Sequence, residues 1–244
     1  MPDIDRHLCI VERHAGWAEI IINRPERRNS IIPPLAAEIR NAIEALDKAP
    51  DIAAIVLRGE GGYFCSGIDL KALQQDPPPD WAGKDAGDIR NLHLALYRCK
   101  VPIIAALESF AINAGASLAL ACDLIICGEK AFFQIGEIHQ GAGIPMNAAW
   151  LRIKTTEQVA ARLALMGDRV SPREMLQLGL VTEIFPDDQV VQRCQEIAQR
   201  LAEKPLGASR KIKDSIQAQR QIDDPDAFFP QSSTNALKDA PMLK

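Results

Sequence analysis

Apolar and polar positions alternate along the chain with a period that changes from strand-like to helix-like. Two short apolar segments, residues 8–11 and 17–22, lie on either side of a His-Ala-Gly turn and predict a hairpin. Residues 33–47 then place apolar side chains at helical spacing, with proline in the first turn, where a helix tolerates it. The apolar residues that share this helix face are Leu35, Ile39, Ile43 and Leu46. The pattern therefore predicts an opening unit of strand, strand and helix.

Strand and helix patterns go on alternating as far as residue 127. The predicted strands are residues 53–57, 103–107 and 124–127, and the predicted helices are residues 89–97 and 116–121. Such repeated alternation is typical of an α/β core. Residues 74–88, which contain three consecutive prolines and several Gly and Asp residues, predict an exposed and mobile loop.

Helical patterns replace the strand pattern from residue 187 onward, at residues 190–202 and 206–219. We therefore divide the chain into a core, residues 1–186, and a C-terminal helical region, residues 187–244. The apolar residues of the first of these helices include Val190, Val191, Ile197 and Leu201. Because little of the core is left for them to cover, we expect this region to bind neighbouring subunits.

Composition narrows the class of protein. A chain of 244 residues, 47% hydrophobic and 25% charged, is long enough for one large globular core. The formal net charge of −4 gives no reason to expect nucleic acid binding, and no apolar run approaches the roughly 20 residues of a membrane helix. The six cysteines include no Cys-x-x-Cys pair, and there is no signal-peptide pattern. We expect reduced thiols and a cytoplasmic protein that binds no membrane.

Two turns of small residues are candidates for binding an anion. Residues 108–123 predict a buried strand, a turn and then a helix, whose first amides, at Ala114 and Gly115, have no acceptor within the helix. An oxyanion placed against these amides would be stabilised. A second turn, within residues 58–71, follows an apolar run in the same way. One backbone N–H from each turn would form an oxyanion hole.

Several segments match, in order, the motifs of one protein family. Residues 64–70 are similar to the motif Phe-Cys-Ala-Gly-x-Asp-Leu, residues 23–30 to Asn-Arg-Pro-x-x-x-Asn-Ala, and residues 100–106 to Lys-Pro-x-Ile-Ala-Ala. Further matching segments are residues 128–133, 167–171 and 179–181. On these motifs, which together cover roughly residues 8 to 210, the chain resembles the crotonase (enoyl-CoA hydratase/isomerase) superfamily.

The resemblance implies a fold, a substrate class and an assembly. The fold is a spiral of repeated ββα units, and the C-terminal helices pack against neighbouring subunits to make a homotrimer or a hexamer. The substrate is an acyl-CoA thioester, so coenzyme A belongs to the substrate and no permanently bound cofactor or metal is expected. The histidines show no metal-ligand spacing. Relatives usually carry a further helical stretch that helps to hold the adenine end of coenzyme A, and we expect this contact to be missing here, because the sequence stops at residues 242–244.

The resemblance also assigns catalytic roles, residue by residue. Glu137 matches the catalytic glutamate, and the backbone amides of Ile68 and Ala114 match the oxyanion donors. Ser117 stands where hydratases have a second glutamate, whereas Δ3,Δ2-enoyl-CoA isomerases place a non-acidic residue there. One carboxylate is enough to move a proton from C2 to C4 of a 3-enoyl thioester, so isomerisation in fatty-acid or related acyl-CoA metabolism is favoured over hydration.

Further residues are assigned to the binding site. The residues expected to contact coenzyme A are Arg28, Ser66, Ile68 and Lys71. Asp69 is expected to cap the turn rather than to take part in chemistry. The residues expected to line the acyl pocket, and so to raise the pKa of Glu137, are Phe132, Phe133 and Ile144.

Some alternatives stay open at this stage. A β-carbon at Ala114 is expected to strain its turn. His139 is either a second acid/base group or a structural residue, and Glu108 is either an alternative base or the partner of an arginine; we favour the second reading of each. The function could also be hydration, decarboxylation or hydrolysis, or the binding of acyl-CoA or a protein partner without turnover.

Overall fold

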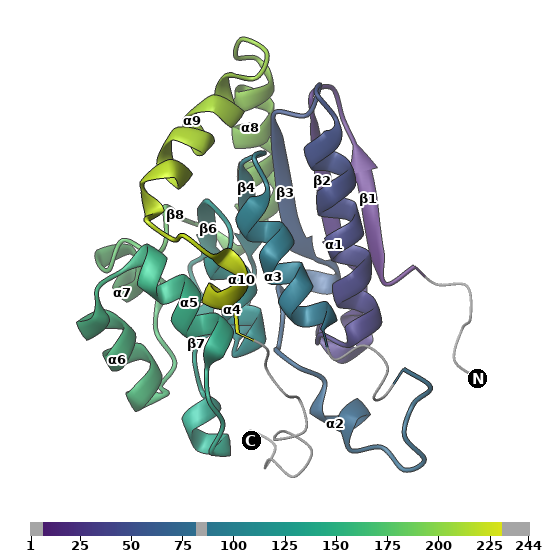
Figure 1. Ribbon diagram of the computed structural model, residues 1–244, viewed down its shortest axis with the longest axis vertical. Helices are drawn as coiled ribbons and strands as arrows, with labels where there is room; N and C mark the ends of the chain where they lie inside the picture. Colours follow the sequence, from purple (N-terminus) through teal and green to yellow (C-terminus); the bar gives the residue numbers. More distant parts are fainter. Residues whose placement is uncertain (1–6, 82–86, 231–244) are drawn as a thin grey trace.

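A six-stranded sheet runs through the centre of the molecule (Figure 1). The computed structural model describes residues 7–81 and 87–230. The strands of this sheet are β1 (Cys9–Arg13), β2 (Trp17–Ile22), β3 (Ala54–Gly59), β4 (Ile103–Leu107), β6 (Leu124–Gly128) and β8 (Glu183–Phe185). They lie in the order β1-β2-β3-β4-β6-β8, and all neighbours are parallel except β1 and β2, which form the predicted hairpin. Parallel neighbours require crossover connections, which explains the alternation along the sequence.

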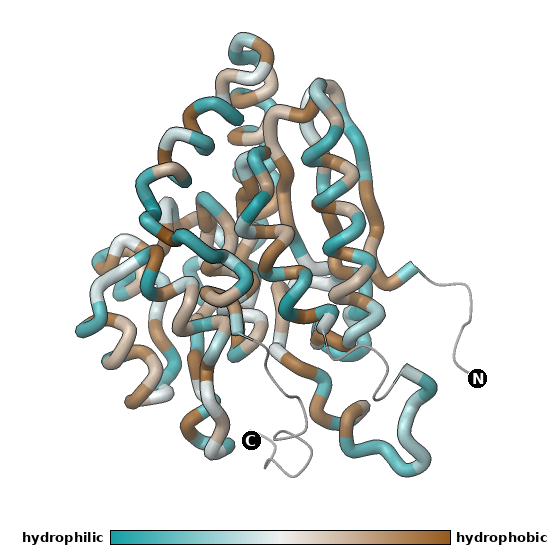
Figure 2. Tube along the Cα trace, in the orientation of Figure 1, coloured by the Kyte–Doolittle hydropathy of each residue, from teal (hydrophilic) through white to brown (hydrophobic). Residues whose placement is uncertain are grey.

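Helices α1 (Pro33–Lys48) and α3 (Asp88–Arg98) cover one face of the sheet (Figure 1). The buried face of α1 is the predicted one. Figure 2 shows hydrophobic and hydrophilic positions alternating along this helix. Strand β2, by contrast, is buried at every residue, as expected of a strand that is covered on both faces.

Helix α8 (Val190–Ala202) covers the opposite face. Its Val190, Cys194 and Ala198 are fully buried there and pack against Trp17 and Ile104, among others. The expectation that this helix had little of the core left to cover was therefore wrong. Side chains of a strand alternate between the two faces of a sheet, so the second face of β2, β3 and β4 needed a cover of its own.

Helix α9 (Ala208–Gln217) carries apolar residues that the core does not use. Ile212 and Ile216 are 65% and 63% exposed, and Leu206, just before the helix, is 78% exposed. The other side of α9 is tied to the core, because Lys213 donates to the Val101 carbonyl and its ammonium group lies 2.7 Å from a carboxylate oxygen of Asp123. An exposed apolar surface of the C-terminal region thus lies on α9 rather than on α8.

A second ladder of strand pairs lies beside the sheet and gives the fold its spiral. Strands β5 (Phe110–Ile112) and β7 (Phe132–Gln134) are parallel, and isolated bridges join Ile31 to Ile68 and Cys65 to Ala111. Each of these pairs joins one turn of the chain to the next. The crotonase-type spiral predicted from the sequence is confirmed.

The remaining helices include several that the sequence pattern did not predict. Helix α4 (Ala114–Leu120) was predicted as residues 116–121. The additional helices are α2 (Leu70–Leu73), α5 (Pro145–Lys154), α6 (Glu157–Met166), α7 (Pro172–Gln177) and α10 (Pro225–Phe228). The predicted loop has neither helix nor strand over residues 74–81, while residues 82–86 lie outside the described part of the chain.

The segment formed by α10 and Phe229 folds back onto α3 and α5. Phe229 is fully buried, with its ring centroid 5.2 Å from that of Trp150 and 5.5 Å from that of Tyr97. Arg90 of α3 holds the segment by donating to the carbonyl oxygens of Phe229 and Asp226. Residues far apart in the sequence thus form one wall of the molecule.

The cysteines and the lengths of the helices bear on two further predictions. All six cysteines lie in the described part of the chain, and all are free thiols, as expected. Within the described residues, no helix combines the length and the apolar character that crossing a membrane requires.

Candidate active site

The two turns expected to form the oxyanion hole lie against each other. Ile31 pairs with the first turn through its N–H, which donates to the Gly67 carbonyl, and through its own carbonyl, which accepts from Asp69. This pairing leaves the Ile68 N–H with no acceptor among the described residues. A β-carbon added to Gly67 would lie 2.9 Å from the Ile112 carbonyl oxygen, so the first turn is in direct contact with the second.

The second donor begins helix α4. The Ala114 N–H has no acceptor within the described residues, as is usual for the first residue of a helix. A β-carbon on Gly115 would overlap the Cys65 carbonyl oxygen, so glycine is required for the start of α4 to approach the first turn. The structure therefore brings both predicted oxyanion donors to one place.

The backbone strain expected at Ala114 lies one residue earlier. Asn113 has φ 52° and ψ −113°, a conformation that favours glycine. The Asn113 side chain is held by the next turn of the spiral, because its Oδ1 accepts from the Gly136 N–H at 2.8 Å and its Nδ2 donates to Gln140 at 3.2 Å. The conformation is thus fixed by contacts that the local sequence does not reveal.

Glu137 lies at the start of a short 3₁₀ helix, η3 (Glu137–Gln140), and is 8% exposed. Burial raises its pKa to about 7, although hydrogen bonds from its own N–H and from Asn147 act in the opposite direction. Asn147 donates to Glu137 Oε1 at 3.0 Å, whereas Oε2 is buried without a partner in the described part of the protein. Such a carboxyl group suits a general base near neutral pH.

Only one of the three residues expected to line the acyl pocket does so. Ile144 lines the cavity that contains Glu137. Phe133 is instead fully buried in the core, and Phe132 packs between Phe110 and the guanidinium group of Arg169. Further apolar side chains of the cavity wall include Ile89 and Met146.

Ser117 belongs to a buried polar network. Its hydroxyl group donates to the Ala114 carbonyl at 2.8 Å and lies 3.3 Å from His93 Nε2, while Trp150 donates to His93 Nδ1 at 2.9 Å. Burial lowers the pKa of His93 to about 3, so the imidazole is neutral. Since Nδ1 accepts from Trp150, the proton is on Nε2, which donates to Ser117.

His93 is a cavity residue to which the sequence analysis gave no role. Both His93 and Ser117 line the cavity with Glu137. A single histidine on the apolar face of a helix resembles ordinary core, and its partner Trp150 lies 57 residues further along the chain. No local pattern could have identified this pair.

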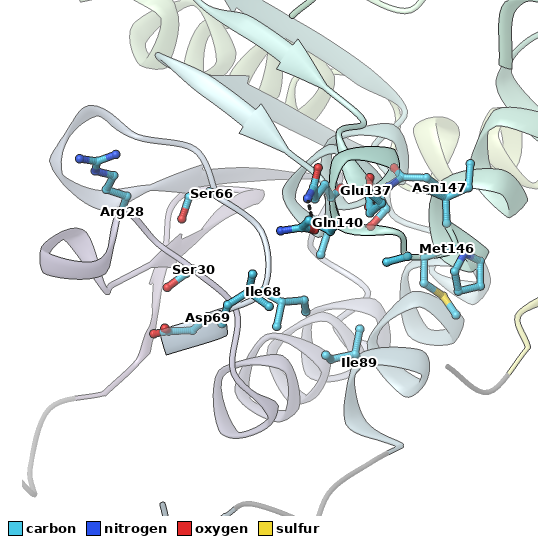
Figure 3. Close-up of a pocket in the computed structure, with 18 of the residues that line it drawn as sticks. Arg28, Ser30, Ser66, Ile68, Asp69, Ile89, Glu137, Gln140, Met146 and Asn147 are labelled. Carbon is cyan, nitrogen blue, oxygen red and sulfur yellow. Dashed lines mark hydrogen bonds between the residues drawn. The ribbon is translucent and has the colours of Figure 1, made fainter. Parts of the chain in front are cut away.

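The residues expected to contact coenzyme A line the same cavity, which has a volume of ≈ 670 Å³. They are Arg28, Ser66, Ile68 and Lys71. Figure 3 shows Arg28 and Ser66 on one side, Glu137 and Asn147 on the other, and Ile68 between them. Arg28 and Lys71 are exposed, so their charges lie at the mouth of the cavity, where they could meet phosphate groups.

Asp69 caps α2, as predicted, and also forms a buried ion-pair cluster. Its carboxylate accepts from the Ala72 N–H and pairs with Arg24 at 3.0 Å and with Arg27 at 2.6 Å. Burial by itself would raise the pKa of Asp69, but the hydrogen bonds from Arg27, Ala72 and Arg24 bring it down to about 2. The cluster therefore fixes the turn that carries the Ile68 amide.

His139 and Glu108 do not reach the cavity. His139 is exposed, and its Nε2 lies 3.1 Å from the Gly167 carbonyl oxygen, as expected of a structural residue. Burial raises the pKa of Glu108, and the nearby charge of Arg58 lowers it less. Among the described residues, Arg58 forms its ion pairs with Glu19 and Glu60, so the pairing expected for Glu108 is not formed.

One group of residues has ligand atoms close enough for a metal ion, although the histidines had shown no such spacing. The ligand atoms of Glu12, His14 and Glu19 lie within 4.8 Å of one another. Glu19 is already engaged, since it accepts from Arg58 at 2.7 Å and from Gln195 at 2.7 Å. None of the three lines the cavity, so the site does not involve them.

A spiral α/β fold with a buried carboxyl group and two free backbone amides in one cavity is the arrangement that the resemblance to the crotonase superfamily implied. Comparison with known proteins agrees, because the sequence model of the enoyl-CoA hydratase/isomerase family matches residues 12–235. The chain belongs to this family. Enoyl-CoA hydratase EchA19 of Mycobacterium tuberculosis is 32% identical over 90% of this chain and 84% of its own length. The peroxisomal Δ(3,5)-Δ(2,4)-dienoyl-CoA isomerase of Arabidopsis thaliana is 33% identical over 68% of this chain and 64% of its own.

Solved structures are similar over most of the chain. An enoyl-CoA hydratase/isomerase from Xanthobacter autotrophicus has a TM-score of 0.79 at 29% identity, over 87% of this chain and 79% of its own. A monofunctional enoyl CoA isomerase from Mycobacterium smegmatis has a TM-score of 0.73 at 26% identity, over 89% and 95%. Hydratases and isomerases thus both occur among the relatives, and family membership does not choose between the two reactions.

Proposed function

We propose that this protein is a Δ3,Δ2-enoyl-CoA isomerase. The observation that carries the proposal is a cavity with two free backbone amides in which Glu137 is the one buried acid, among the described lining residues, that no ion pair engages. The other lining acids are Glu26, which is exposed, and Asp69, which pairs with Arg24 and Arg27. The position of the second glutamate of hydratases is occupied by Ser117, whose hydroxyl proton is engaged by the Ala114 carbonyl. This arrangement suits proton transfer by one group.

The reaction uses Glu137 first as a base and then as an acid. Oε2 of Glu137 removes a proton from C2 of a 3-enoyl thioester, and the negative charge moves to the thioester oxygen. The N–H groups of Ile68 and Ala114 stabilise this dienolate. The protonated carboxyl group then returns the same proton to C4, which gives the 2-enoyl thioester and regenerates the carboxylate.

Coenzyme A would enter from the side that carries Arg28 and Lys71. Their positive charges suit the phosphate groups, and Ser66 lies between Arg28 and Ile68 (Figure 3). The reacting end of the acyl group would then lie between Ile68 and Glu137, against the apolar side chains of Ile89 and Met146.

Substrate conversion tests the proposal. Purified protein is incubated with 3-enoyl-CoA, 2-enoyl-CoA and 3-hydroxyacyl-CoA of matched chain length, and conversion is followed by absorbance and chromatography. Conversion of 3-enoyl-CoA to 2-enoyl-CoA without hydration supports the isomerase. Tight binding without conversion of any substrate would instead indicate an acyl-CoA-binding protein.

Replacement of the base gives the sharpest single variant. Glu137→Gln keeps the size of the side chain and its hydrogen bond from Asn147 but cannot accept the proton. Isomerisation should fall by about 10² to 10⁴-fold, while the affinity for acyl-CoA measured by calorimetry should change little. Activity within a few fold of the unsubstituted protein would place the base elsewhere.

One observation favours a second candidate, hydration of 2-enoyl-CoA. Glu137 Oε2 and Asn147 Oδ1 are both buried acceptors without a partner among the described residues, and both side chains line the cavity. A water molecule that donated to both would keep its lone pair for attack on C3. The same substrate panel separates the two reactions, since only hydration produces 3-hydroxyacyl-CoA.

A further inference from the structure

Asn147 contacts both the proposed base, Glu137, and the backbone at the start of α4. Its Nδ2 donates to Glu137 Oε1 at 3.0 Å and to the Asn113 carbonyl oxygen at 3.1 Å. The Asn113 carbonyl and the Ala114 N–H belong to the same planar peptide unit. One side-chain amide therefore holds the base and the peptide unit that supplies an oxyanion donor.

The orientation of this amide is determined by its surroundings. If Asn147 were turned by 180° about its last bond, Oδ1 would face two acceptors, the Asn113 carbonyl and the Glu137 carboxyl group. Asn147 is only 2% exposed, and its Oδ1 has no partner in the described part of the chain. An apolar residue of similar volume would avoid burying this unpaired acceptor, so packing alone does not explain the asparagine.

Asn113 makes a second link between the same two segments. Its backbone precedes Ala114, and its Oδ1 accepts from the N–H of Gly136, the residue before Glu137, at 2.8 Å. Asn113 also keeps a backbone conformation, φ 52° and ψ −113°, that glycine adopts more easily. The side chain thus supplies a contact that glycine could not make.

We propose that Asn147, together with Asn113, is a positioning residue that fixes the Glu137 carboxyl group relative to the oxyanion-hole amide of Ala114. The hydrogen bond on Oε1 leaves Oε2 as the oxygen that takes the proton. The hydrogen bond on the Asn113 carbonyl polarises the peptide unit and makes the Ala114 N–H a stronger donor. The catalytic meaning of this role rests on the proposed function, but the hydrogen bonds belong to the protein without substrate.

Titration of Glu137 tests the role of Asn147 without any substrate. The protein is labelled with ¹³C at the glutamate carboxyl carbons, and the Glu137 signal is assigned by its loss in Glu137→Gln. In Asn147→Leu the ionised carboxylate loses a hydrogen bond, so its pKa should rise by about 1 to 2 pH units. Asn147→Ala, which cannot overfill the site, should show the same rise if the leucine variant folds poorly. A titration that both variants leave unchanged would overturn the proposal.

The carbonyl group of a bound thioester reports on the oxyanion hole. Infrared difference spectra of a bound saturated acyl-CoA give the carbonyl stretching frequency, which falls as the carbonyl is polarised. In Asn147→Leu the frequency should fall less than in the unsubstituted protein, because the Ala114 N–H is a weaker donor. An equal frequency in the two proteins would contradict the link to the oxyanion hole.

Asn113→Gly tests the second link, because glycine keeps the backbone conformation and removes only the side chain. The turnover rate should fall by up to about 10²-fold, with little change in KM and with the Glu137 pKa unaltered. Asn41→Leu, an exposed asparagine of α1, is the matched control and should change neither quantity. A turnover rate that Asn113→Gly leaves intact would overturn the part assigned to Asn113.

The two proposals can fail separately. If the protein converts no 3-enoyl-CoA and the Glu137 titration still moves in Asn147→Leu, the proposed reaction is wrong and the positioning role is supported. If the protein is an isomerase and Asn147→Leu changes neither the titration nor the turnover rate, the positioning role is wrong.

Discussion

Glu137 combines burial with a carboxyl oxygen, Oε2, that has no hydrogen-bond partner among the described residues. Burial raises its pKa from 4.5 to about 7. The folded protein therefore binds the carboxyl proton of Glu137 more tightly than the unfolded chain does. The contribution of this proton to the free energy of unfolding is complete below pH 4.5 and is lost as the pH rises through 7. A buried carboxyl group in a cavity, with a pKa raised in this way, is typical of a functional site.

The activity should follow the ionisation of this carboxyl group. Because the base must be ionised in the free enzyme, kcat/KM for 3-enoyl-CoA should rise with pH and reach half of its plateau near pH 7. Steady-state rates between pH 5 and 9 measure this. A profile without any inflection between pH 6 and 8 would show that Glu137 is not the titrating base.

Ser117 offers a way to introduce the second carboxyl group of a hydratase. Ser117→Glu should raise the hydration of 2-enoyl-CoA above the unsubstituted level, because the residue lines the same cavity as Glu137. The gain should be small, since a displacement of about 1 Å can cost a factor of 10² and the new group must displace the contact with His93. Ser117→Gln is the control that adds bulk without a titrating group. Equal hydration by both variants would mean that Ser117 does not face the reacting carbon.

At the scale of elements, the contact between α4 and the first turn sets the width of the oxyanion hole. A methyl group on Gly115 would overlap the Cys65 carbonyl oxygen, so α4 could begin here only by moving away. The turn on the other side is fixed by the pairing of Ile31 with Ile68 and by the Asp69 cluster. The helix rather than the turn would therefore shift.

Gly115→Ala should damage both stability and catalysis. Overpacking should lower the free energy of unfolding by about 3 kcal/mol, and displacement of the Ala114 amide should slow turnover by about 10²-fold. Urea denaturation and steady-state kinetics measure the two effects. Gly143→Ala is the control for stability, since a β-carbon there meets nothing within 4 Å. Gly115→Ala with normal stability and rate would mean that α4 tolerates the added group.

Helices and strands could be predicted from the sequence where the spacing of apolar residues follows a single helical or strand period. Prediction failed where the position of a residue depends on contacts between distant elements. The face of α1 that carries Leu35 and Ile39 was predicted correctly, because helical spacing alone marks it. The apolar face of α8 was also evident, but a pattern does not say what covers it, and the answer was the second face of the chain's own sheet. Glu137 could be found from its motif.

The supporting residues of the site could not be found in this way. His93 depends on Trp150, 57 residues away, and Asn147 depends on the Asn113 carbonyl, 34 residues away. These roles arise only when the spiral brings separate turns together. The local sequence identifies the candidate reacting groups, whereas only the folded chain shows which residues hold them.

At the scale of the whole molecule, we predict a homotrimer or a hexamer formed by two such trimers. The surface that supports this prediction is α9, where Ile212 and Ile216 remain exposed. Sedimentation velocity at micromolar concentration measures the assembly. Ile212→Lys combined with Ile216→Lys should reduce it to smaller species, while Val11→Lys, on the exposed side of β1, should not. A monomer in the unsubstituted protein would contradict the prediction.

The burial of Phe229 has a consequence for how the protein is made. Helix α3 leaves the ribosome early and presents Tyr97 and His93 to a wall that only the segment around Phe229 completes. Domains generally begin to fold from the N-terminal end during synthesis, at roughly 5–20 residues per second. Between the synthesis of α3 and that of Phe229, the nascent chain therefore carries an aromatic cluster that this segment has yet to cover. Because Phe229 follows every described residue that lines the cavity, vectorial synthesis completes this wall only after the cavity lining has been made.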